Sequence, residues 1–202
     1  MKRPVIVLGA GGHARVLLET LRQLQVPVIG VTDLHPDEVD RARIGVPVLG
    51  EDTQISKHKP LEIYLVNGVG STGDASVRKA LFEDLKKKGY TYMSVIHPSA
   101  VNAKDAQIAE GAQIMAGAVV QTGSRIGENA IVNTRASVDH DCWVGAHAHI
   151  APGAVLCGDV EVGEGAHIGA GAVVVQGISV PQRTLVKALT LVKAGVEGAR
   201  ER

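Results

Sequence analysis

The fold is decided by the stretch IGENAIVNTRASVDHDCWVGAHAHI, residues 126–150, in which an aliphatic side chain returns at every sixth position. The same register holds without a break along residues 108–180. Its members are Ile108, Ile114, Val120, Ile126, Val132, Val138, Val144, Ile150, Leu156, Val162, Ile168, Val174 and Val180. This period is typical of a left-handed parallel β-helix, in which each hexad forms one short strand and one corner, and about three hexads close a triangular coil.

The remaining positions of each hexad fit tight corners. The residue four places after the aliphatic one is usually small, as at Ala112, Ala130 and Ala148, and the residue before it is often Gly, Asn or Asp. Glycine, and sometimes asparagine or aspartate, tolerates the positive φ that such a corner requires. Prisms of this kind are usually capped or assembled with copies of themselves, so we expect a homotrimer.

Composition agrees with regular, repeated packing. The chain has 202 residues, of which 45% are hydrophobic and only 2% aromatic, so small aliphatic side chains must fill the core. Lys plus Arg and Asp plus Glu both number 21, which gives no electrostatic case for a nucleic-acid partner or an anionic membrane. No apolar run approaches the roughly 20 residues that span a bilayer, and no signal-peptide cleavage site is recognisable. With two cysteines, Cys142 and Cys157, reduced thiols in a cytoplasmic protein are expected.

A different pattern precedes the hexads. Residues 4–8 predict a buried strand, residues 9–14 (GAGGHA) a glycine loop, residues 15–25 a helix, and residues 28–31 a second strand followed by Asp33. This order makes half of a Rossmann-like fold, in which glycines let the backbone approach a phosphate and the helix N-terminus favours an anion. Glycines also occur in such turns for steric reasons alone. Because the module is short, a single nucleotide is expected rather than NAD.

The rest of the front part sets the expected boundaries. Residues 63–66 predict a third strand leading into Asn67-Gly-Val-Gly70, residues 77–88 an amphipathic helix, and residues 92–96 a last strand. We therefore expect an α/β Rossmann-like domain over residues 1–97, a left-handed parallel β-helix of hexapeptide repeats over residues 98–182, and a C-terminal tail over residues 183–202.

The two parts together resemble the NeuD/PglD-type sugar acyltransferases. The similarity rests on GAGGH at residues 9–13 and SVDHDC at residues 137–142 and extends over residues 4–180. It implies an acetyl-CoA-dependent N-acetyltransferase of glycan biosynthesis that acts on a nucleotide-linked amino sugar. The front domain would hold the nucleotide, acetyl-CoA would lie along the β-helix, and the active sites would lie between subunits of the trimer.

The resemblance also implies roles for single residues. His140 would be the catalytic base and Asp141 the acid beside it, while His149 would lie near the thioester of acetyl-CoA. Gly158 and Ala170 would be further cofactor contacts. The substrate-binding group would comprise Gly11, Gly12, His13, Asp33, Gly68 and Asn133. Members of the family often end in a G-V-P-A segment over the adenine of the cofactor. Residues 180–193 (VPQRTLVKALTLVK) depart from that pattern, so contacts that cap the cofactor do not follow for this chain.

Chemistry supports a role for the histidines of the opening stretch. An amine that attacks a thioester arrives protonated and needs a base with a pKa near neutral, which histidine supplies and an adjacent carboxylate orients. The register points Val138 inward and leaves Asp139, His140 and Asp141 outward. We therefore expect direct transfer, with His140 taking the proton and a backbone N–H or His149 stabilising the oxyanion.

Other residues of the stretch keep more than one interpretation. Cys142 could carry a covalent acetyl group, but it occupies the small corner position and is expected in the core. His147 is expected at the surface or behind the site, and Trp143 could stack on a ligand or on a neighbouring subunit. His167 lies one coil beyond His149 and is a candidate for the cofactor groove, with a structural role as the alternative. For His13, the structural alternative to substrate binding is to cap the helix that follows it.

Three rival functions are open to the sequence. A trimeric β-helix carbonic anhydrase would need zinc, but the histidine spacings do not reproduce its ligand set, so no metal is expected. A non-catalytic hexapeptide scaffold would have no use for the pair His140 and Asp141. A sialic-acid-type sugar O-acetyltransferase would use the same base, so the motif does not separate O- from N-transfer. The sugar and its nucleotide, UDP or GDP, are equally open.

Overall fold

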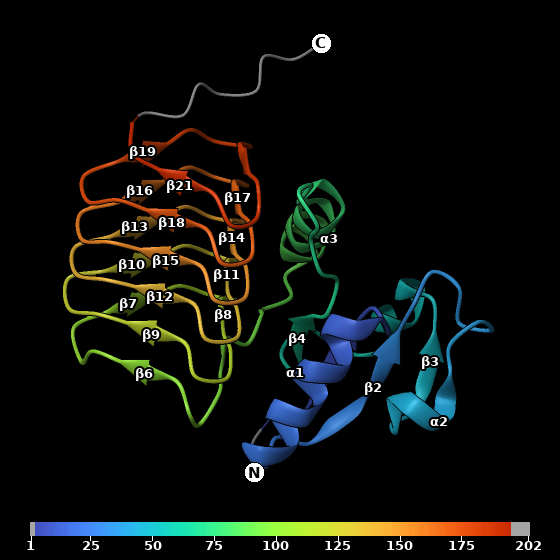
Figure 1. The fold of residues 1–202 in the computed structure, drawn as a ribbon. Helices are drawn as coiled ribbons and strands as arrows, with labels where there is room; N and C mark the ends of the chain where they lie inside the picture. Colours follow the sequence, from blue (N-terminus) through green and yellow to red (C-terminus); the bar gives the residue numbers. More distant parts are fainter. Residues whose placement is uncertain (1–2, 195–202) are drawn as a thin grey trace.

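The computed structural model describes residues 3–194 and divides them into an α/β domain and a β-helix that lie side by side (Figure 1). The α/β domain has a four-stranded parallel sheet of order β3-β2-β1-β4. Its strands are β1 (Val5–Leu8), β2 (Val28–Thr32), β3 (Val48–Gly50) and β4 (Tyr64–Asn67). Every residue of β1 is buried, as expected for the central region of a parallel sheet covered on both faces.

Two helices cover the sheet from opposite sides. Helix α1 (Gly12–Gln23) packs against the face that carries Val5 and Val7, and α3 (Ser76–Lys87) packs against the face of Ile6 and Leu8. Successive side chains of a strand point to opposite faces, which is why β1 contributes to both hydrophobic clusters. The strand–glycine turn–helix–strand order expected from the sequence is thus present.

The pattern of residues 34–62 predicts none of the elements found there. These are α2 (Arg41–Ile44), β3 and the 3-10 helix η1 (Asp52–Lys57). Each is short, and β3 follows Pro47 at the edge of the sheet, so no periodic signal develops. The strand expected over residues 92–96 divides in two: Tyr92 bridges Leu65 of the α/β domain, whereas β5 (Val95–Ile96) pairs with the β-helix.

The β-helix has three parallel sheets, one for each side of a triangular prism. The domain-covered face, against which the α/β domain packs, contains β5, β8 (Gln113–Ile114), β11 (Ile131–Val132), β14 (His149–Ile150), β17 (His167–Ile168) and β20 (Leu185–Val186). The valine face contains β6 (Val101–Asn102), β9 (Val119–Val120), β12 (Ser137–Val138), β15 (Val155–Leu156), β18 (Val173–Val174) and β21 (Leu191–Val192). The tryptophan face contains β7 (Gln107–Ile108), β10 (Arg125–Ile126), β13 (Trp143–Val144), β16 (Glu161–Val162) and β19 (Ser179–Val180).

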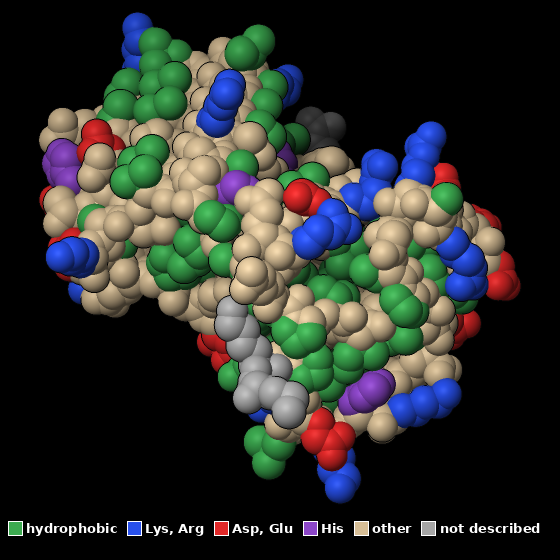
Figure 2. Space-filling model, turned by 90° about the horizontal axis from the view of Figure 1, so that it is seen from below, with side chains coloured by type: hydrophobic (Ala, Val, Ile, Leu, Met, Phe, Trp, Pro, Cys, Tyr) green, Lys and Arg blue, Asp and Glu red, His purple; other side chains and the backbone are tan. Residues whose placement is uncertain are grey.

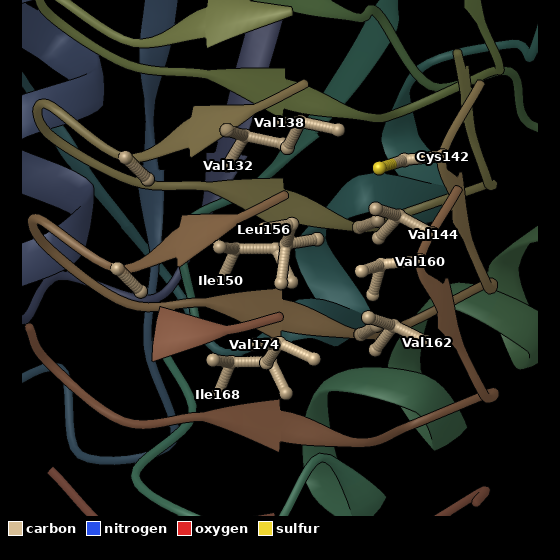
Figure 3. Packing of buried hydrophobic residues seen from close by; sticks show 14 of the residues in the cluster. Val132, Val138, Cys142, Val144, Ile150, Leu156, Val160, Val162, Ile168 and Val174 are labelled. Atoms are coloured by element: carbon tan, nitrogen blue, oxygen red, sulfur yellow. The ribbon is translucent and has the colours of Figure 1, made fainter. Parts of the chain in front are cut away.

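The aliphatic register forms the core of the prism, as predicted. Val138, Val144 and Ile150 are fully buried, and their counterparts in the next coils stack directly on them (Figure 3). Burying each such side chain contributes about 1.5–3 kcal/mol. The non-glycine corner residues Asn129 and Asp141 have φ of 55° and 59°, the left-handed conformation expected at these positions. The predicted fold class, an α/β Rossmann-like domain followed by a left-handed parallel β-helix, is confirmed.

The coils continue past residue 182. Leu185–Val186 and Leu191–Val192 add β20 and β21 to their sheets, and Val186 and Val192 extend the buried columns. The segment expected to be a tail from residue 183 therefore continues the β-helix up to residue 192, and the aliphatic register carries on, with Leu185, Leu189 and Leu191 exposed on the surface. The remainder of that expected tail, residues 195–202, lies outside the described residues.

A buried arginine fixes the two parts to each other. Arg78 of α3 donates to the backbone oxygens of Asn67 (2.8 Å) and Val69 (2.7 Å) in the α/β domain and of Asn129 (3.2 Å) in the β-helix. Burial lowers its pKa to about 9, so the guanidinium stays charged at neutral pH. Hydrogen bonds from a charged donor are the stronger kind, and these three carbonyls hold the domains in one orientation.

The surface carries charges of both signs. Seen from below, Lys, Arg, Asp and Glu side chains are interspersed, with hydrophobic patches between them (Figure 2). Within residues 3–194, none of the helices has the length and apolar character needed to cross a bilayer.

Candidate active site

His140 lies at an exposed corner between the valine and tryptophan faces, where the chain passes from β12 to β13. Its Nδ1 is 2.9 Å from Oδ2 of Asp141. The side chains of His140 and Asp141 are 47% and 66% exposed, so both can reach a ligand. Because a carboxylate accepts, Nδ1 carries the proton and Nε2 keeps its lone pair, which is the arrangement a general base requires.

Two glycines make room for this pair. A Cβ at Gly158, one coil above, would lie inside contact distance of Cε1 and Nε2 of His140 and 3.0 Å from its Cδ2. A Cβ at Gly123, one coil below Asp141, would similarly overlap the Asp141 carboxylate. The missing side chains thus fix where the ring and carboxylate lie. The Nε2 edge of the ring rests on Gly158, the residue that the resemblance assigns to the cofactor.

The surroundings raise the pKa of His140 above its usual value. The hydrogen bond that Nδ1–H donates to Asp141 is the main cause, partial desolvation opposes it, and the nearby charges of Asp139, Asp141 and Asp159 add to the increase. The imidazolium is therefore a more stable product of proton abstraction here than in an isolated histidine.

A second group of predicted residues lines a cavity of about 660 Å³ between the two domains. Its lining includes Gly11, Gly12, His13, Asp33, Gly68, Asn133 and His149. Every residue expected to bind the substrate is therefore in one cavity, together with one expected to bind the cofactor. The cavity is lined largely by backbone and small side chains, as a pocket for a phosphorylated ligand should be.

The glycine loop opens the N-terminus of α1 toward this cavity. Gly11 is the N-cap of α1 and provides no side-chain cap, and space is open where Cβ atoms of Gly11 and Gly12 would be. The first N–H groups of α1 are consequently available to an anion. Asp33 holds the loop from the side, since its Oδ2 accepts from the Ala10 N–H at 2.8 Å and its Oδ1 from the His35 N–H at 3.0 Å.

His13 ties the loop to the β-helix in addition to lining the cavity. Its Nε2 is 2.7 Å from Oε1 of Gln113 on β8. Gln113 donates its amide nitrogen to the Asn67 oxygen at 2.7 Å, so Oε1 is the acceptor and the His13 ring donates. Burial, with the charge of Arg78, lowers the pKa of His13 to about 4. The ring is uncharged at neutral pH and supports the wall of the pocket. This structural role differs from the helix capping considered from the sequence.

His149 is held on both sides of its ring. Oδ1 of Asn133 accepts from the Thr134 N–H at 2.7 Å, so the Asn133 amide nitrogen donates to Nε2 of His149 at 3.0 Å. Nδ1 then carries the proton and donates toward the backbone oxygen and hydroxyl of Ser71, at 3.0 and 2.9 Å. Burial, followed by the influence of His167, lowers the pKa of His149 to about 3. This histidine is neutral and anchors the 68–73 loop, which walls the cavity.

The other histidines of the predicted set have different surroundings. His167 stacks edge-on against His149 with ring centroids 4.7 Å apart. His147 is buried, bonded to Asn129 at 2.9 Å and packed on Phe82 of α3, so the expected surface location is wrong because the α/β domain covers this corner. Cys142 is buried in the core as predicted, and Trp143 is 58% exposed.

A single chain does not bring the two groups together. The cavity lies where the domain-covered face meets the valine face, at the corners that contain Asn133 and Pro152. His140 and Gly158 lie on the opposite edge of the valine face. Ala170 belongs to the cavity-side edge, two coils above Asn133 and its neighbours. The cofactor candidates Gly158 and Ala170 are therefore on different edges of the prism.

Several residues that build the pocket escape sequence reasoning. Gln113 and Ser71 hold the two pocket histidines, and Arg78 supports the loop behind them. Gln113 is a polar residue at an outward position of β8, and only the structure shows that it is completely buried. Arg78 and Ser71 follow no motif. Within residues 3–194 no group of three metal-ligating side chains is placed to hold an ion.

Comparison with known proteins agrees with this architecture. Residues 4–85 match the PglD N-terminal domain, and residues 141–176 match the bacterial transferase hexapeptide repeats. The GDP-perosamine N-acetyltransferase of Caulobacter crescentus, solved with CoA and GDP-perosamine, is 35% identical, with a TM-score of 0.87 and coverage of 95% of this chain and 90% of that one. The acetyltransferase domain of PglB from Neisseria gonorrhoeae, solved with acetyl coenzyme A, is 32% identical, with a TM-score of 0.88 and coverage of 97% and 93%. The chain belongs to the NeuD/PglD-type family of sugar acyltransferases.

Proposed function

We propose that this protein transfers the acetyl group of acetyl-CoA to the amino group of a nucleotide-linked amino sugar, of the UDP-4-amino-4,6-dideoxy or GDP-perosamine type. It is an acetyltransferase with acetyl-CoA as co-substrate, as its similarity to the perosamine and PglB enzymes shows. The observation that carries the acceptor assignment is the cavity at the N-terminus of α1, because a nucleotide acceptor gives that cavity a ligand and a free sugar does not.

The nucleotide is assigned to the cavity from its backbone chemistry. The uncapped N-terminus of α1 and the glycines of the loop suit the diphosphate. Asp33 stands at the end of β2, where an acid can accept from a ribose or base, although its carboxylate already holds the loop. The neutral rings of His13 and His149 complete the wall without adding charge.

The mechanism assigns proton transfer to His140. Acetyl-CoA supplies the acetyl group as a thioester. His140 Nε2 accepts the proton that the acceptor nitrogen loses as the new C–N bond forms, and it returns that proton to the sulfur as the C–S bond breaks. Asp141 holds the ring through Nδ1 and stabilises the imidazolium in between. In this proposal the backbone N–H of Gly158, the residue against which the ring lies, stabilises the oxyanion.

A homotrimer completes this site in the proposal. Apart from Ser137, the outward positions of the valine face are apolar, with Val101 and Leu191 exposed and Val119, Val155 and Val173 half-buried. If three valine faces point toward a common axis, the His140 edge of one copy meets the cavity edge of the next. Gly158 and Ala170 then come from neighbouring copies and border one groove parallel to the axis, which suits an extended cofactor.

The proposal extends to the setting of the reaction. Nucleotide-linked sugars are activated donors of glycosyl groups, so we place the protein in the cytoplasm as an enzyme of glycan biosynthesis. The acceptor nucleotide and the ring position that is acetylated follow from the acceptor test below.

Thiol release from acetyl-CoA tests the function. The acceptor panel contains UDP-4-amino-4,6-dideoxy sugars, GDP-perosamine and free sialic acid, and release with one nucleotide-linked amine supports the proposal. His140→Ala should lower turnover by about 10²–10⁴-fold, the usual contribution of a general base. His58→Ala, remote from both edges of the valine face, is the matched control and should keep full activity.

The alternatives give different outcomes in the same assay. Release only with sialic acid would favour the sugar O-acetyltransferase and remove the nucleotide acceptor. Absence of both thiol release and acetyl-CoA binding would favour a non-catalytic scaffold. Equal turnover of His140→Ala and the unchanged protein would exclude His140 as the base.

A further inference from the structure

Three carboxylates surround His140, and the mechanism uses only one of them. Asp139 and Asp141 flank it in the same corner, and Asp159 occupies the position of Asp141 one coil above. All three are exposed side chains. Asp141 bonds the ring, and Oδ1 of Asp139 accepts from the His140 backbone N–H at 2.8 Å.

The geometry fixes Asp159 next to the reacting edge of the ring. Its backbone N–H donates to the His140 oxygen at 2.9 Å, and it directly follows Gly158, on which the Nε2 edge rests. The left-handed backbone of Asp159, with φ of 57°, repeats that of Asp141. Its position is therefore set by the stacked corners and not by a flexible segment.

The carboxylate of Asp159 is free. Among residues 3–194 it forms neither a hydrogen bond nor an ion pair, in contrast to the carboxylates of Asp139 and Asp141. The nearest cations by register are Lys104, two coils below His140, Lys193, two coils above Cys157, and Arg125 on the tryptophan face one coil below Trp143. None of the three is in an ion pair with these acids within the described part of the chain. The corner thus has an excess of negative charge at the point where the acceptor must arrive.

We propose that Asp159 is a selectivity-determining residue that favours an amine acceptor over a hydroxyl acceptor. The inference rests on the proposed function and specifies what the shared base leaves open, namely the choice between N- and O-acetylation.

The two reactions place different charge beside His140. When an amine attacks the thioester carbonyl, the C–N bond forms before its proton has fully left, so the nitrogen carries positive charge until His140 takes that proton and the C–S bond breaks. When a hydroxyl attacks, its proton must move to His140 as the C–O bond forms, and the oxygen is at no point more positive than an alcohol. A negative carboxylate at Asp159 stabilises the imidazolium in both reactions. In the first it also stabilises the positively charged nitrogen, so the amine acceptor gains more.

The test compares two carboxylates of the same corner column. Asp159→Asn removes the charge beside the ring, whereas Asp105→Asn removes a charge two coils below Asp141, where the side chain holds Thr122 and Gly123. The acceptors are a nucleotide-linked 4-amino-4,6-dideoxy sugar and the analogue with a hydroxyl at the same carbon. The measured quantity is the ratio of kcat/KM for amine over hydroxyl.

We expect Asp159→Asn to lower this ratio about tenfold, an effect of the size that one nearby unit charge has in a site between bulk water and protein interior. Asp105→Asn should leave the ratio unchanged. An Asp159→Asn ratio equal to that of the unchanged protein overturns the inference while leaving the proposed function intact.

A second readout does not depend on turnover. NMR titration of His140 should show a lower pKa in Asp159→Asn than in Asp105→Asn, since Asp159 contributes to the increase. Equal His140 pKa values in the two variants would contradict the inference even if no acceptor in the panel were acetylated. Absence of thiol release by the unchanged protein, with acetyl-CoA bound, would instead count against the proposed function.

Discussion

Gly158→Ala should lower the activity and leave the stability nearly unchanged, because the added methyl group would occupy the space of the His140 ring. Its Cβ would lie 3.0 Å from Cδ2 and still nearer to Cε1 and Nε2, whereas carbon atoms pack best at about 3.5–4.0 Å. The ring must therefore move by about 1 Å. The backbone of Gly158 is outside the positive-φ region, so alanine adds no conformational strain at this position.

A displacement of this size matters to the chemistry much more than to the fold. Misplacing a catalytic group by 1 Å costs on the order of 10²-fold in rate, while the half-exposed His140 ring can swing toward solvent with little loss of stability. We expect kcat for thiol release to fall about 100-fold and the Tm to stay within roughly 2 °C.

Gln176→Ala is the matched control, since residue 176 occupies the same corner position one coil above Gly158. It should leave both kcat and Tm unchanged. Full activity of Gly158→Ala would refute the reasoning, because it would mean that the position of the ring over Gly158 is not the one used in the reaction.

Four further predictions concern the domain contact, the pocket, the pair of His140 and Asp141, and the assembly. Arg78→Met leaves the carbonyl oxygens of Val69 and Asn129 without this donor, while that of Asn67 keeps the amide of Gln113. The substitution should lower the free energy of unfolding in urea by about 3 kcal/mol, whereas a change below about 1 kcal/mol would contradict the clamp. The pKa of buried His149 falls from 6.5 to about 3 on folding, so the unfolded state takes up its proton first. This residue alone should lower the free energy of unfolding by about 1.4 kcal/mol per pH unit from pH 6.5 toward pH 4, in addition to the contribution of His13. His149→Gln should reduce the slope by that amount in denaturant titrations, and an unchanged slope would argue against a neutral His149. Asp141→Asn removes the main cause of the raised pKa of His140, so the acid limb of the kcat/KM profile should move to lower pH with reduced maximal rate, and a limb that moves to higher pH would contradict the pairing. Val155→Asp places a charge on the valine face and should convert the proposed homotrimer to monomers in analytical ultracentrifugation, whereas the control Glu161→Asp on the tryptophan face should have the same mass as the unchanged protein.

The two groups of site residues lie at opposite edges of the valine face of the prism. Corners at opposite edges of one flat face cannot meet within a triangular coil, because the face between them is rigid and its strands are hydrogen-bonded to the coils above and below. Assembly about a threefold axis joins opposite edges without deforming either. In the proposal, the valine face is therefore both the contact between subunits and the means of completing the site.

The candidate site was only partly predictable. His140, Asp141 and the glycine loop follow from local pattern, because a charged pair at a corner and a strand–glycine–helix turn are local features. His149 was expected beside the thioester; in the structure Nε2 is bonded to Asn133 of the β-helix and Nδ1 to Ser71 of the α/β domain. His147 was misplaced for the same reason, since no pattern within the hexads shows which face the α/β domain covers.

The sequence by itself determines the prism. A six-residue period needs only neighbouring coils to become a core, so Val138, Val144 and Ile150 could be assigned inward from their spacing alone. The tertiary structure determines which contacts the outward residues of the prism make. Contacts such as His13 with Gln113 and Arg78 with Asn129 join residues 100 and 51 positions apart, and they depend on how two separately patterned domains dock. The six-residue pattern does not predict how the domains dock. The pocket, its neutral histidines and the free carboxylate beside His140 are therefore visible only in the folded chain.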